Sequence, residues 1–322
     1  MIALHSNGYG SIDQLEFREM EKPVPEDNEV GIRIMASSVN SWDLDLVRGK
    51  PFYVKLVYPG GRKRPKAILG CDVAGVVESV GPAVKVLKEG DRVFGDLSTS
   101  GWGGFAEYAT APEDQFALIP DNVSFEDAAS IPQAGLLALQ GLRNAGKVQA
   151  GEHVVLNGGG GGVGTLGIQL LREYGAEITV VDRAVKEQGI MDLGAHHFID
   201  FEKTDYLEKA SVYDVNLDVV GNRKYAELKR NLKTGGRYVM VGGDASLIFR
   251  ILLGLPFNRK KKMNILPHET SKEDLKFFAD RLADGRMKAI IDKTFAFDQI
   301  PQAIQHLWNG NVVGKVVISH VD

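Results

Sequence analysis

Residues 157 to 164 read NGGGGGVG, and this glycine run limits what the chain around it can fold into. A flexible linker would have polar flanks without hydrophobic periodicity. Instead, the preceding stretch from His153 to Leu156 is short, apolar and β-branched, which predicts a buried strand. After the glycines, apolar residues recur at helical spacing, namely Val163, Leu166, Leu170, Leu171 and Tyr174. The pattern therefore predicts a strand, a tight turn and a helix.

The spacing of the glycines indicates a dinucleotide site. Gly159, Gly161 and Gly164 satisfy G-x-G-x-x-G, which permits a tight turn, close approach of the backbone to a pyrophosphate, and close packing of helix on strand. The helix N-terminus then offers free N–H groups and partial positive charge to phosphates. The residues of the turn expected to bind the cofactor are Gly159, Gly160, Gly161, Gly162, Val163 and Gly164.

The next expected strand ends on an acid, Asp182, 18 residues after Gly164. Asp182 can accept hydrogen bonds from the ribose hydroxyls of an adenine nucleotide, which favours NADH. Arg183 and Lys186 follow directly and can hold a 2′-phosphate, which favours NADPH. The alternative for these residues is an ordinary solvated loop. The sequence thus predicts NADP(H) or NAD(H) as the cofactor and leaves the preference open.

The sequence pattern that predicts secondary structure changes twice along the chain. The first 120 residues contain strand-like runs broken by Gly and Pro, such as Val30–Met35, typical of a mostly-β domain. From about residue 123, helices alternate with buried strands, which implies parallel strands with right-handed crossovers. The candidate strands there are His153–Asn157, Ile178–Val181, His197–Ile199, Val215–Val219, Tyr238–Val241 and Met263–Leu266. After Pro267 we expect a helix capped by Ser271, a second helix that stops at Gly310, and a final strand.

Composition excludes several function classes. The 322 residues are 44% hydrophobic and 25% charged, as in an ordinary soluble protein. A net charge of −4 gives no general attraction to nucleic acid. The N-terminus lacks the pattern of a signal peptide, and no run approaches the roughly 20 apolar residues of a membrane span. With one cysteine there is no intrachain disulfide. We expect a cytoplasmic protein without a nucleic-acid partner.

Short motifs recur along the chain in a characteristic order. They are VNSWD at 39–43, GCDVAG at 70–75, GDRVFG at 90–95, GFAEY at 104–108, the glycine turn, LGA at 193–195, DVVGN at 218–222 and GKVV at 314–317. None is specific alone. By their order and spacing the chain resembles the medium-chain dehydrogenase/reductase superfamily over nearly its whole length, and within it the zinc-independent quinone oxidoreductase (zeta-crystallin-like) branch.

This resemblance implies an α/β protein with two domains. A GroES-like, mostly-β catalytic domain would comprise residues 1–122 and 267–322, and a Rossmann-type, doubly wound parallel-sheet domain would comprise residues 123–266. The resemblance further implies an active site in the cleft between them and a homodimer or homotetramer. It also assigns further residues to the cofactor, namely Val220, Asn222, Val241, Gly242, Gly243 and Lys315.

Departures from the superfamily pattern bear on a metal. Where zinc-dependent members have a ligand cysteine, this chain has Asn40, and where they have Gly-His-Glu it has Gly followed by Cys71 and Asp72. The third ligand position falls near Ala134, and a four-cysteine structural zinc lobe has no counterpart in residues 95–104. Catalytic zinc needs three protein ligands and an open position. We therefore expect no zinc, and we expect Cys71 to be a small buried residue rather than a nucleophile.

Without a Lewis acid, oxidation of an unactivated alcohol is difficult, whereas a quinone or a conjugated enone takes up negative charge itself. Asn40 and Ser41 can donate hydrogen bonds to the acceptor oxygen, and Asp43 can orient them. The alternative is that Asn40 only caps a turn and Asp43 only holds backbone. No general acid is evident. The sequence predicts an NAD(P)H-dependent quinone or enone oxidoreductase; the rivals are a non-catalytic nucleotide-binding sensor or structural protein and, less favoured, an alcohol dehydrogenase.

One stretch allows a different partner. Leu247 to Phe257 is strongly apolar and runs into the basic residues Arg259 to Lys262. Such a segment, Leu247 to Lys262, can lie on an anionic membrane surface. It can equally cover the substrate cleft or a subunit interface, and the sequence leaves these alternatives open.

Overall fold

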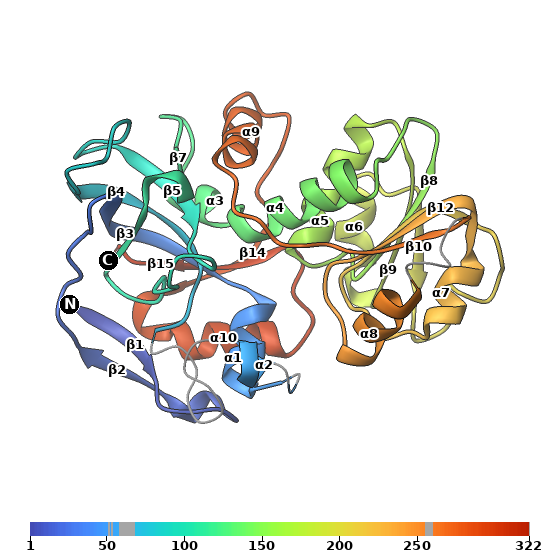
Figure 1. The fold of residues 1–322 in the computed structure, drawn as a ribbon, viewed down its shortest axis with the longest axis horizontal. Coiled ribbons are helices and arrows are strands. Elements are labelled where there is room, and N and C mark those ends of the chain that lie inside the picture. The colour runs from blue at the N-terminus through green and yellow to red at the C-terminus, as the bar shows by residue number, and fades with distance from the viewer. Residues whose placement is uncertain (51, 53, 58–67, 255–259, 322) are drawn as a thin grey trace. The chain divides into compact units, whose positions relative to one another are not determined.

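A computed structural model describes residues 1–50, 52, 54–57, 68–254 and 260–321 of the chain. The chain forms two compact units (Figure 1). The first unit contains Met1–Leu136 and Glu269–Asp322, and the second contains Leu137–His268. The second unit is therefore one continuous stretch, whereas the first needs both ends of the sequence.

The first unit is built mainly from strands. Its large sheet has the order β14-β15-β3-β4-β5-β7, with β6 paired to β3. These strands are β3 (Glu29–Val39), β4 (Asp72–Val80), β5 (Arg92–Asp96), β6 (Tyr108–Pro112), β7 (Phe116–Leu118), β14 (Ile291–Ala296) and β15 (Lys315–Ser319). A separate antiparallel pair comprises β1 (Ile2–Ser6) and β2 (Leu15–Glu19). The expected mostly-β domain is confirmed.

The helices of the first unit include the two that the sequence predicts after Pro267. They are α1 (Ser41–Arg48), α2 (Val54–Val57), α3 (Phe125–Ala129), α9 (Lys272–Ala283) and α10 (Ile300–Trp308), and α4 (Pro132–Gln140) runs from the first unit into the second. Ser271 caps α9, because its side chain accepts a hydrogen bond from the Asp274 N–H at 3.2 Å. Gly285, with φ +75°, follows the end of that helix.

The C-terminal strand joins the sheet through its neighbours. β15 pairs in parallel with β14 and antiparallel with β3, so that Val316 lies opposite Val39. Beneath them, α1 and α10 contribute Leu46, Ile300 and Ile304 to one apolar core. Burying these side chains stabilises the arrangement by about 1.5–3 kcal/mol each.

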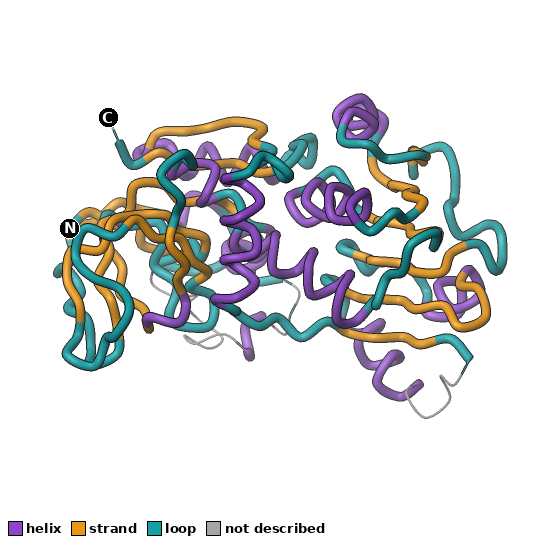
Figure 2. Tube along the Cα trace, turned by 90° about the horizontal axis from the view of Figure 1, so that it is seen from above, coloured by secondary structure: helices purple, strands orange, loops and turns teal. Residues whose placement is uncertain are grey.

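The second unit contains a six-stranded, all-parallel sheet of order β10-β9-β8-β11-β12-β13. Its strands are β8 (His153–Asn157), β9 (Glu177–Asp182), β10 (His197–Asp200), β11 (Tyr213–Asp218), β12 (Leu232–Met240) and β13 (Lys262–Ile265). Its helices are α5 (Gly162–Glu173), α6 (Glu187–Asp192), α7 (Tyr225–Asn231) and α8 (Ala245–Gly254), and Figure 2 shows the strands of this unit running between helices. From β8 the chain adds β9 and β10 on one side, and it then returns to add β11, β12 and β13 on the other side. The strand order therefore reverses between β8 and β11.

All six strands expected from the sequence are present in this unit, and each pairs in parallel with its neighbours, which confirms the doubly wound sheet. β12 is longer than predicted: it begins at Leu232, whereas the sequence indicates a start at Tyr238. Gly235, with φ +83°, and Gly236 interrupt the apolar pattern there, so the sequence does not indicate the first part of the strand.

α8 carries the first part of the apolar stretch that the sequence singled out. Phe249, Leu252 and Leu253 on this helix are more than half exposed. Residues 255 to 259 of that stretch lie outside the described residues. Among the helices that the structure describes, none has both the length and the apolar composition to cross a bilayer.

The glycine turn between β8 and α5 is packed too tightly for side chains at two positions. A Cβ on Gly159 would lie 2.4 Å from the Val180 side chain, and a Cβ on Gly164 would lie 2.2 Å from the backbone of Gly159. Gly158 has φ +83°, a conformation that favours glycine. The turn therefore needs glycine at Gly159 and Gly164 because strand and helix approach each other closely, as the motif predicts.

We expect Gly164→Ala to lower the free energy of unfolding by about 1–3 kcal/mol, because the added methyl group overlaps the Gly159 backbone, which has no side chain to move aside. Gly161→Ala is the matched control. A Cβ there would have its nearest neighbour at 3.8 Å, and the residue has φ −83°. Urea denaturation of both variants measures the difference, and equal stabilities would contradict the packing argument.

Candidate active site

The start of α1 holds the three residues predicted to be catalytic. Asn40 is the N-cap of the helix, and its backbone N–H donates to the Asp43 carboxylate at 2.8 Å. The other oxygen of Asp43 accepts from the Gly70 N–H at 2.9 Å. Asp43 is fully buried, and this burial raises its pKa to about 7 against the opposing effect of the two N–H donors. Asp43 thus fixes the helix start to the segment that precedes β4.

Asp72 is the centre of a second, fully buried network. Its carboxylate accepts hydrogen bonds from Ser38 Oγ at 2.9 Å and from the Gln133 N–H at 2.8 Å. It also forms an ion pair with Lys315, whose Nζ lies 2.9 Å away. The sheet explains this meeting, because Asp72 lies opposite Ser38 on β3, and Lys315 begins the strand on the other side of β3. Three neighbouring strands thus hold one buried pair of charges.

Asn40 belongs to the same network, and its side-chain amide already donates to protein atoms. Its Nδ2 donates to Asp72 at 2.9 Å and to Cys71 Sγ at 3.4 Å, and its Oδ1 accepts from Lys315. Both amide hydrogens therefore point at protein atoms. Asn40 is the N-cap residue of α1, and the Asp43 carboxylate holds two backbone N–H groups, whereas their catalytic roles stay predictions. Ser41 is exposed, and its hydroxyl has no partner among the residues that the structure describes.

Cys71 lies inside this network as a neutral thiol. It is fully buried, and burial together with the nearby Asp72 carboxylate raises the pKa of the thiol well above its usual value. Gln133 Nε2 lies 3.5 Å from the sulfur. Because the thiolate is the reactive form, this geometry agrees with a small buried residue and not with a nucleophile.

The network also bears on whether these residues fit a catalytic zinc. The ligand atoms of Cys71, Asp72 and Asp96 lie within 4.8 Å of one another, so their spacing alone would allow a metal. However, the ammonium group of Lys315 already contacts Asp72, and Ala134, near the third ligand position, has no donor atom. A second cation there would meet charge repulsion. The residues present do not fit a catalytic zinc.

In the second unit, Asp182 and Lys186, two of the residues predicted to determine the cofactor preference, contact the glycine turn. The buried Asp182 carboxylate accepts from the N–H groups of Gly160 and Arg183, each at 2.8 Å. Lys186 is also buried, and its Nζ lies 3.1 Å from Asp182. A Cβ on Gly160 would lie 2.5 Å from the Lys186 side chain. By contrast, Arg183 points to the surface, where it pairs with Glu202 at 3.6 Å.

Further predicted cofactor residues meet at the carboxyl ends of β11 and β12. Buried Asp218 accepts from the Val220 and Gly221 N–H groups at 3.0 and 2.8 Å and from Tyr238 OH at 2.9 Å. A Cβ on Gly221 would lie 2.1 Å from the carbonyl oxygen of Gly242, and Val220 itself approaches Gly158. The residues from the prediction that lie at these strand ends are Val220, Asn222, Val241, Gly242 and Gly243.

Two results of this geometry were not expected. Sequence reasoning did not single out Asp218 and its partner Asn157, although together they organise the strand ends, with Asn157 Nδ2 donating to Asp218 at 2.8 Å. The acid in DVVGN was a signal that could have found them. Lys315, predicted to contact the cofactor, belongs to the first unit and is buried against Asp72 and Asn40. Its contact with the cofactor stays a prediction.

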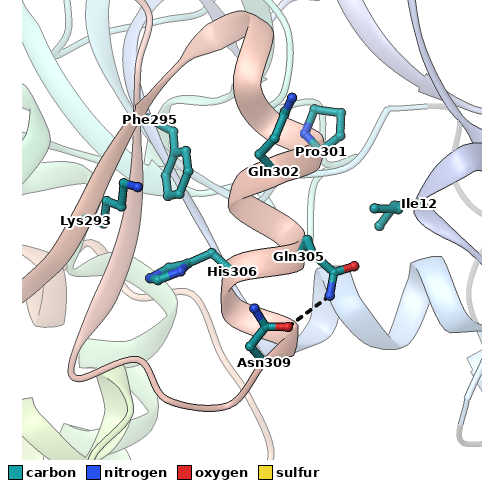
Figure 3. A pocket seen from close by; sticks show the side chains of 8 residues that line it. All are labelled: Ile12, Lys293, Phe295, Pro301, Gln302, Gln305, His306 and Asn309. Carbon is teal, nitrogen blue, oxygen red and sulfur yellow. Dashed lines mark hydrogen bonds between the residues drawn. The ribbon is translucent and has the colours of Figure 1, made fainter.

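A pocket of about 410 Å³ lies elsewhere in the first unit, along α10. Figure 3 shows most of its side chains on α10 and β14, and Gln305 Nε2 donates a hydrogen bond to Asn309 Oδ1 at 3.0 Å. It is lined by Ile12, Lys293, Phe295, Pro301, Gln302, Gln305, His306 and Asn309. None of the predicted site residues is among them, so this pocket is not the candidate active site.

Two family models match the chain. Residues 26–121 match the alcohol dehydrogenase GroES-like domain, and residues 193–318 match the family described as zinc-binding dehydrogenase. A 2-methylene-furan-3-one reductase of Solanum lycopersicum is 34% identical, over 96% of this chain and 76% of that protein. An NADPH-dependent alkenal/one oxidoreductase of Arabidopsis thaliana, described as chloroplastic, is 31% identical, over 96% of this chain and 77% of that protein.

Among solved structures, the quinone oxidoreductase from Coxiella burnetii is similar over the whole chain. Its TM-score is 0.90 at 27% identity, and the match covers 100% of this chain and 99% of that one. The similarity therefore extends over both units. The chain belongs to the medium-chain dehydrogenase/reductase superfamily, in its quinone oxidoreductase branch.

Proposed function

We propose that this chain is an NAD(P)H-dependent oxidoreductase that transfers hydride to a quinone or an α,β-unsaturated carbonyl. The main observation in favour of this kind of acceptor is the buried ion pair of Asp72 with Lys315. It lies among the residues that replace the metal ligands of zinc-dependent members. A site without a Lewis acid suits an acceptor that takes up negative charge itself. The names of the two plant relatives, an enone-type reductase and an alkenal/one oxidoreductase, support the same class.

The residues that would hold the cofactor fit its phosphates. Gly162 and Val163 form the first turn of α5, and the N-cap residue Gly161 places no side-chain cap on the N–H groups of that turn. When bound, the nicotinamide supplies the hydride. In the first unit, Asn40 and Asp43 position the start of α1, and the exposed Ser41 hydroxyl is the group able to hydrogen-bond the acceptor oxygen. Solvent delivers the final proton.

Two rivals make different demands. A nucleotide-binding sensor needs the same glycine turn but no free donor near an acceptor, and the exposed Ser41 favours the enzyme. An alcohol dehydrogenase of this superfamily needs a metal to stabilise the alkoxide, and the Lys315 ammonium against Asp72 disfavours one.

Purified protein should oxidise NADPH or NADH when given 9,10-phenanthrenequinone, 1,4-naphthoquinone or a small enone, and a chelator should leave the rate unchanged. Ser41→Ala should lower kcat/KM roughly tenfold to a hundredfold, because it removes a hydrogen-bond donor to the developing negative charge. Steady-state spectrophotometry measures both. Tight cofactor binding without turnover of any acceptor would favour the sensor, and loss of activity with the chelator would favour the alcohol dehydrogenase.

Lys315→Met should lower the free energy of unfolding by about 3–5 kcal/mol, because it leaves the Asp72 carboxylate buried without its cation. The matched control is Lys276→Met, which breaks a pair with Asp280 whose side chains are 68% and 54% exposed. That change should cost about 1 kcal/mol or less. Urea denaturation compares the two, and similar losses would mean that Lys315 is not the counter-charge we propose.

For the cofactor, we propose a preference for NADPH. Lys186 neutralises Asp182, and three protein groups already contact that carboxylate, so it has reduced capacity to hold ribose hydroxyls or to repel a phosphate. The lysine can then extend to a 2′-phosphate. The name of the Arabidopsis relative, which includes NADPH, supports this choice.

Lys186→Ala should weaken NADPH binding roughly tenfold to a hundredfold and change NADH binding little, because it removes a charge-assisted contact and leaves Asp182 to repel the phosphate. Arg183→Ala is the control, since that side chain points to the surface beside Glu202. Titrations of both cofactors by fluorescence or calorimetry measure the change. Selective loss of NADPH in the Arg183 variant, with Lys186→Ala unaffected, would reverse the assignment.

Three sequence predictions remain predictions. They are the functional division into residues 1–122 with 267–322 and 123–266, the homodimer or homotetramer, and the cytoplasmic location. Two observations support an assembly of subunits. β13 is an edge strand of its sheet, and the neighbouring helix α8 exposes Phe249, Leu252 and Leu253. Light scattering of the purified protein would test the assembly, and a monomer would contradict it.

A further inference from the structure

Two of the three tryptophans in the chain lie face to face beside the candidate active site. Trp42 occupies the first turn of α1, directly after Ser41, and Trp102 lies in the loop that follows β5. Their ring centroids are 6.3 Å apart and their planes differ by 30°, which is a stacked arrangement. The third tryptophan, Trp308, instead contacts the Arg48 guanidinium at 3.8 Å.

The backbone at Trp102 has an unusual conformation. Trp102 has φ +68°, and the glycines on either side, Gly101 and Gly103, have φ +132° and +107°. The other non-glycine residues with positive φ among the described ones, Lys147 and Ser211, are exposed, whereas Trp102 is only 3% exposed. A bulky residue in the left-handed region is strained, and such strain persists where the surroundings hold it and often marks a functional site.

The strained loop is fixed to the same framework as Ser41. The Trp102 N–H donates to the Leu97 carbonyl at 2.9 Å, and the Gly104 N–H donates to the Gly70 carbonyl at 2.8 Å. Gly70 in turn donates its own N–H to Asp43, which anchors the start of α1. The two indoles are therefore positioned by one continuous set of backbone contacts.

The two rings differ in exposure. The buried Trp102 belongs to the apolar core, while Trp42 is partly exposed and packs against that core. Trp102 stacks against the Trp42 ring, and Trp42 follows the exposed Ser41 in the first turn of α1. An indole is rich in π electrons, and quinones are planar and electron-poor, so an offset-stacked contact between them is favourable.

We infer that Trp42, supported from behind by Trp102, is a specificity-determining residue that selects planar, electron-poor acceptors over small open-chain ones. This inference rests on the proposed function and adds the substrate class to it. Ser41 would bond the acceptor oxygen while the neighbouring indole contacts the acceptor ring, so both contacts come from one turn of α1.

The kinetic test compares two acceptors on Trp42→Leu, Trp42→Phe and a control. Trp42→Leu should raise KM for 9,10-phenanthrenequinone roughly fivefold to tenfold and change KM for 3-buten-2-one by less than about twofold. Trp42→Phe, which keeps an aromatic face, should restore most of the difference. Trp308→Phe should behave as wild type, since that ring stacks with Arg48. An unchanged ratio of the two KM values in Trp42→Leu would overturn the inference.

A binding test does not depend on turnover or on the leucine variant. In Trp308→Phe, the tryptophan fluorescence, excited selectively over that of the tyrosines, comes from Trp42 and Trp102. Titration with 1,4-naphthoquinone should quench it saturably, and Trp42→Phe in the same background should lose most of that saturable quenching. Quenching that is linear in quinone, or equal in both proteins, would overturn the inference. Absence of turnover with every acceptor would instead contradict the proposed function while this titration still reports on Trp42.

Discussion

The first unit depends on one buried electrostatic contact, the ion pair of Asp72 with Lys315. Two charges removed from water are costly unless hydrogen bonds satisfy their remaining donors and acceptors. Here Ser38, Asn40 and the Gln133 N–H complete the shell of the carboxylate, and Asn40 also accepts from the ammonium. These partners come from β3, the start of α1 and α4. A contact that links so many elements gives the sheet and the helix one mutual arrangement.

In the second unit, a buried carboxylate, Asp218, has a comparable role, and its partners in the described part of the chain are neutral donors. Asp218 accepts from two backbone N–H groups, from Asn157 and from Tyr238, and burial raises its pKa against these donors. It holds the ends of β8, β11 and β12 together at the point where the strand order reverses. In both units, therefore, a buried carboxylate fixes the backbone from which the exposed functional groups project.

Most of the fold could be predicted because its signals are local. Alternation of apolar strands with helices, the glycine spacing and the caps at Ser271 and Gly285 each depend on a few adjacent residues. The site was less accessible to sequence reasoning. Asn40 looked like a donor to substrate, but its amide is consumed by Asp72 and Cys71, and nothing within 30 residues of it reveals that. The contact of Lys315 with Asp72 could not be predicted, because the two residues are 243 positions apart in the sequence. Asp182 and Lys186 are four residues apart, yet only their burial shows that the two charges neutralise each other.

The position of β15 has a consequence for how the chain is made. Asp72 meets its cation only after 243 further residues, since Lys315 begins the last strand. Synthesis at about 5–20 residues per second takes roughly 12–50 s to cover that distance. During this time β3 lacks the neighbour that completes its edge, whereas the second unit, being continuous, has all its strands available earlier. The sheet of the first unit therefore stays incomplete until β15 has been synthesised.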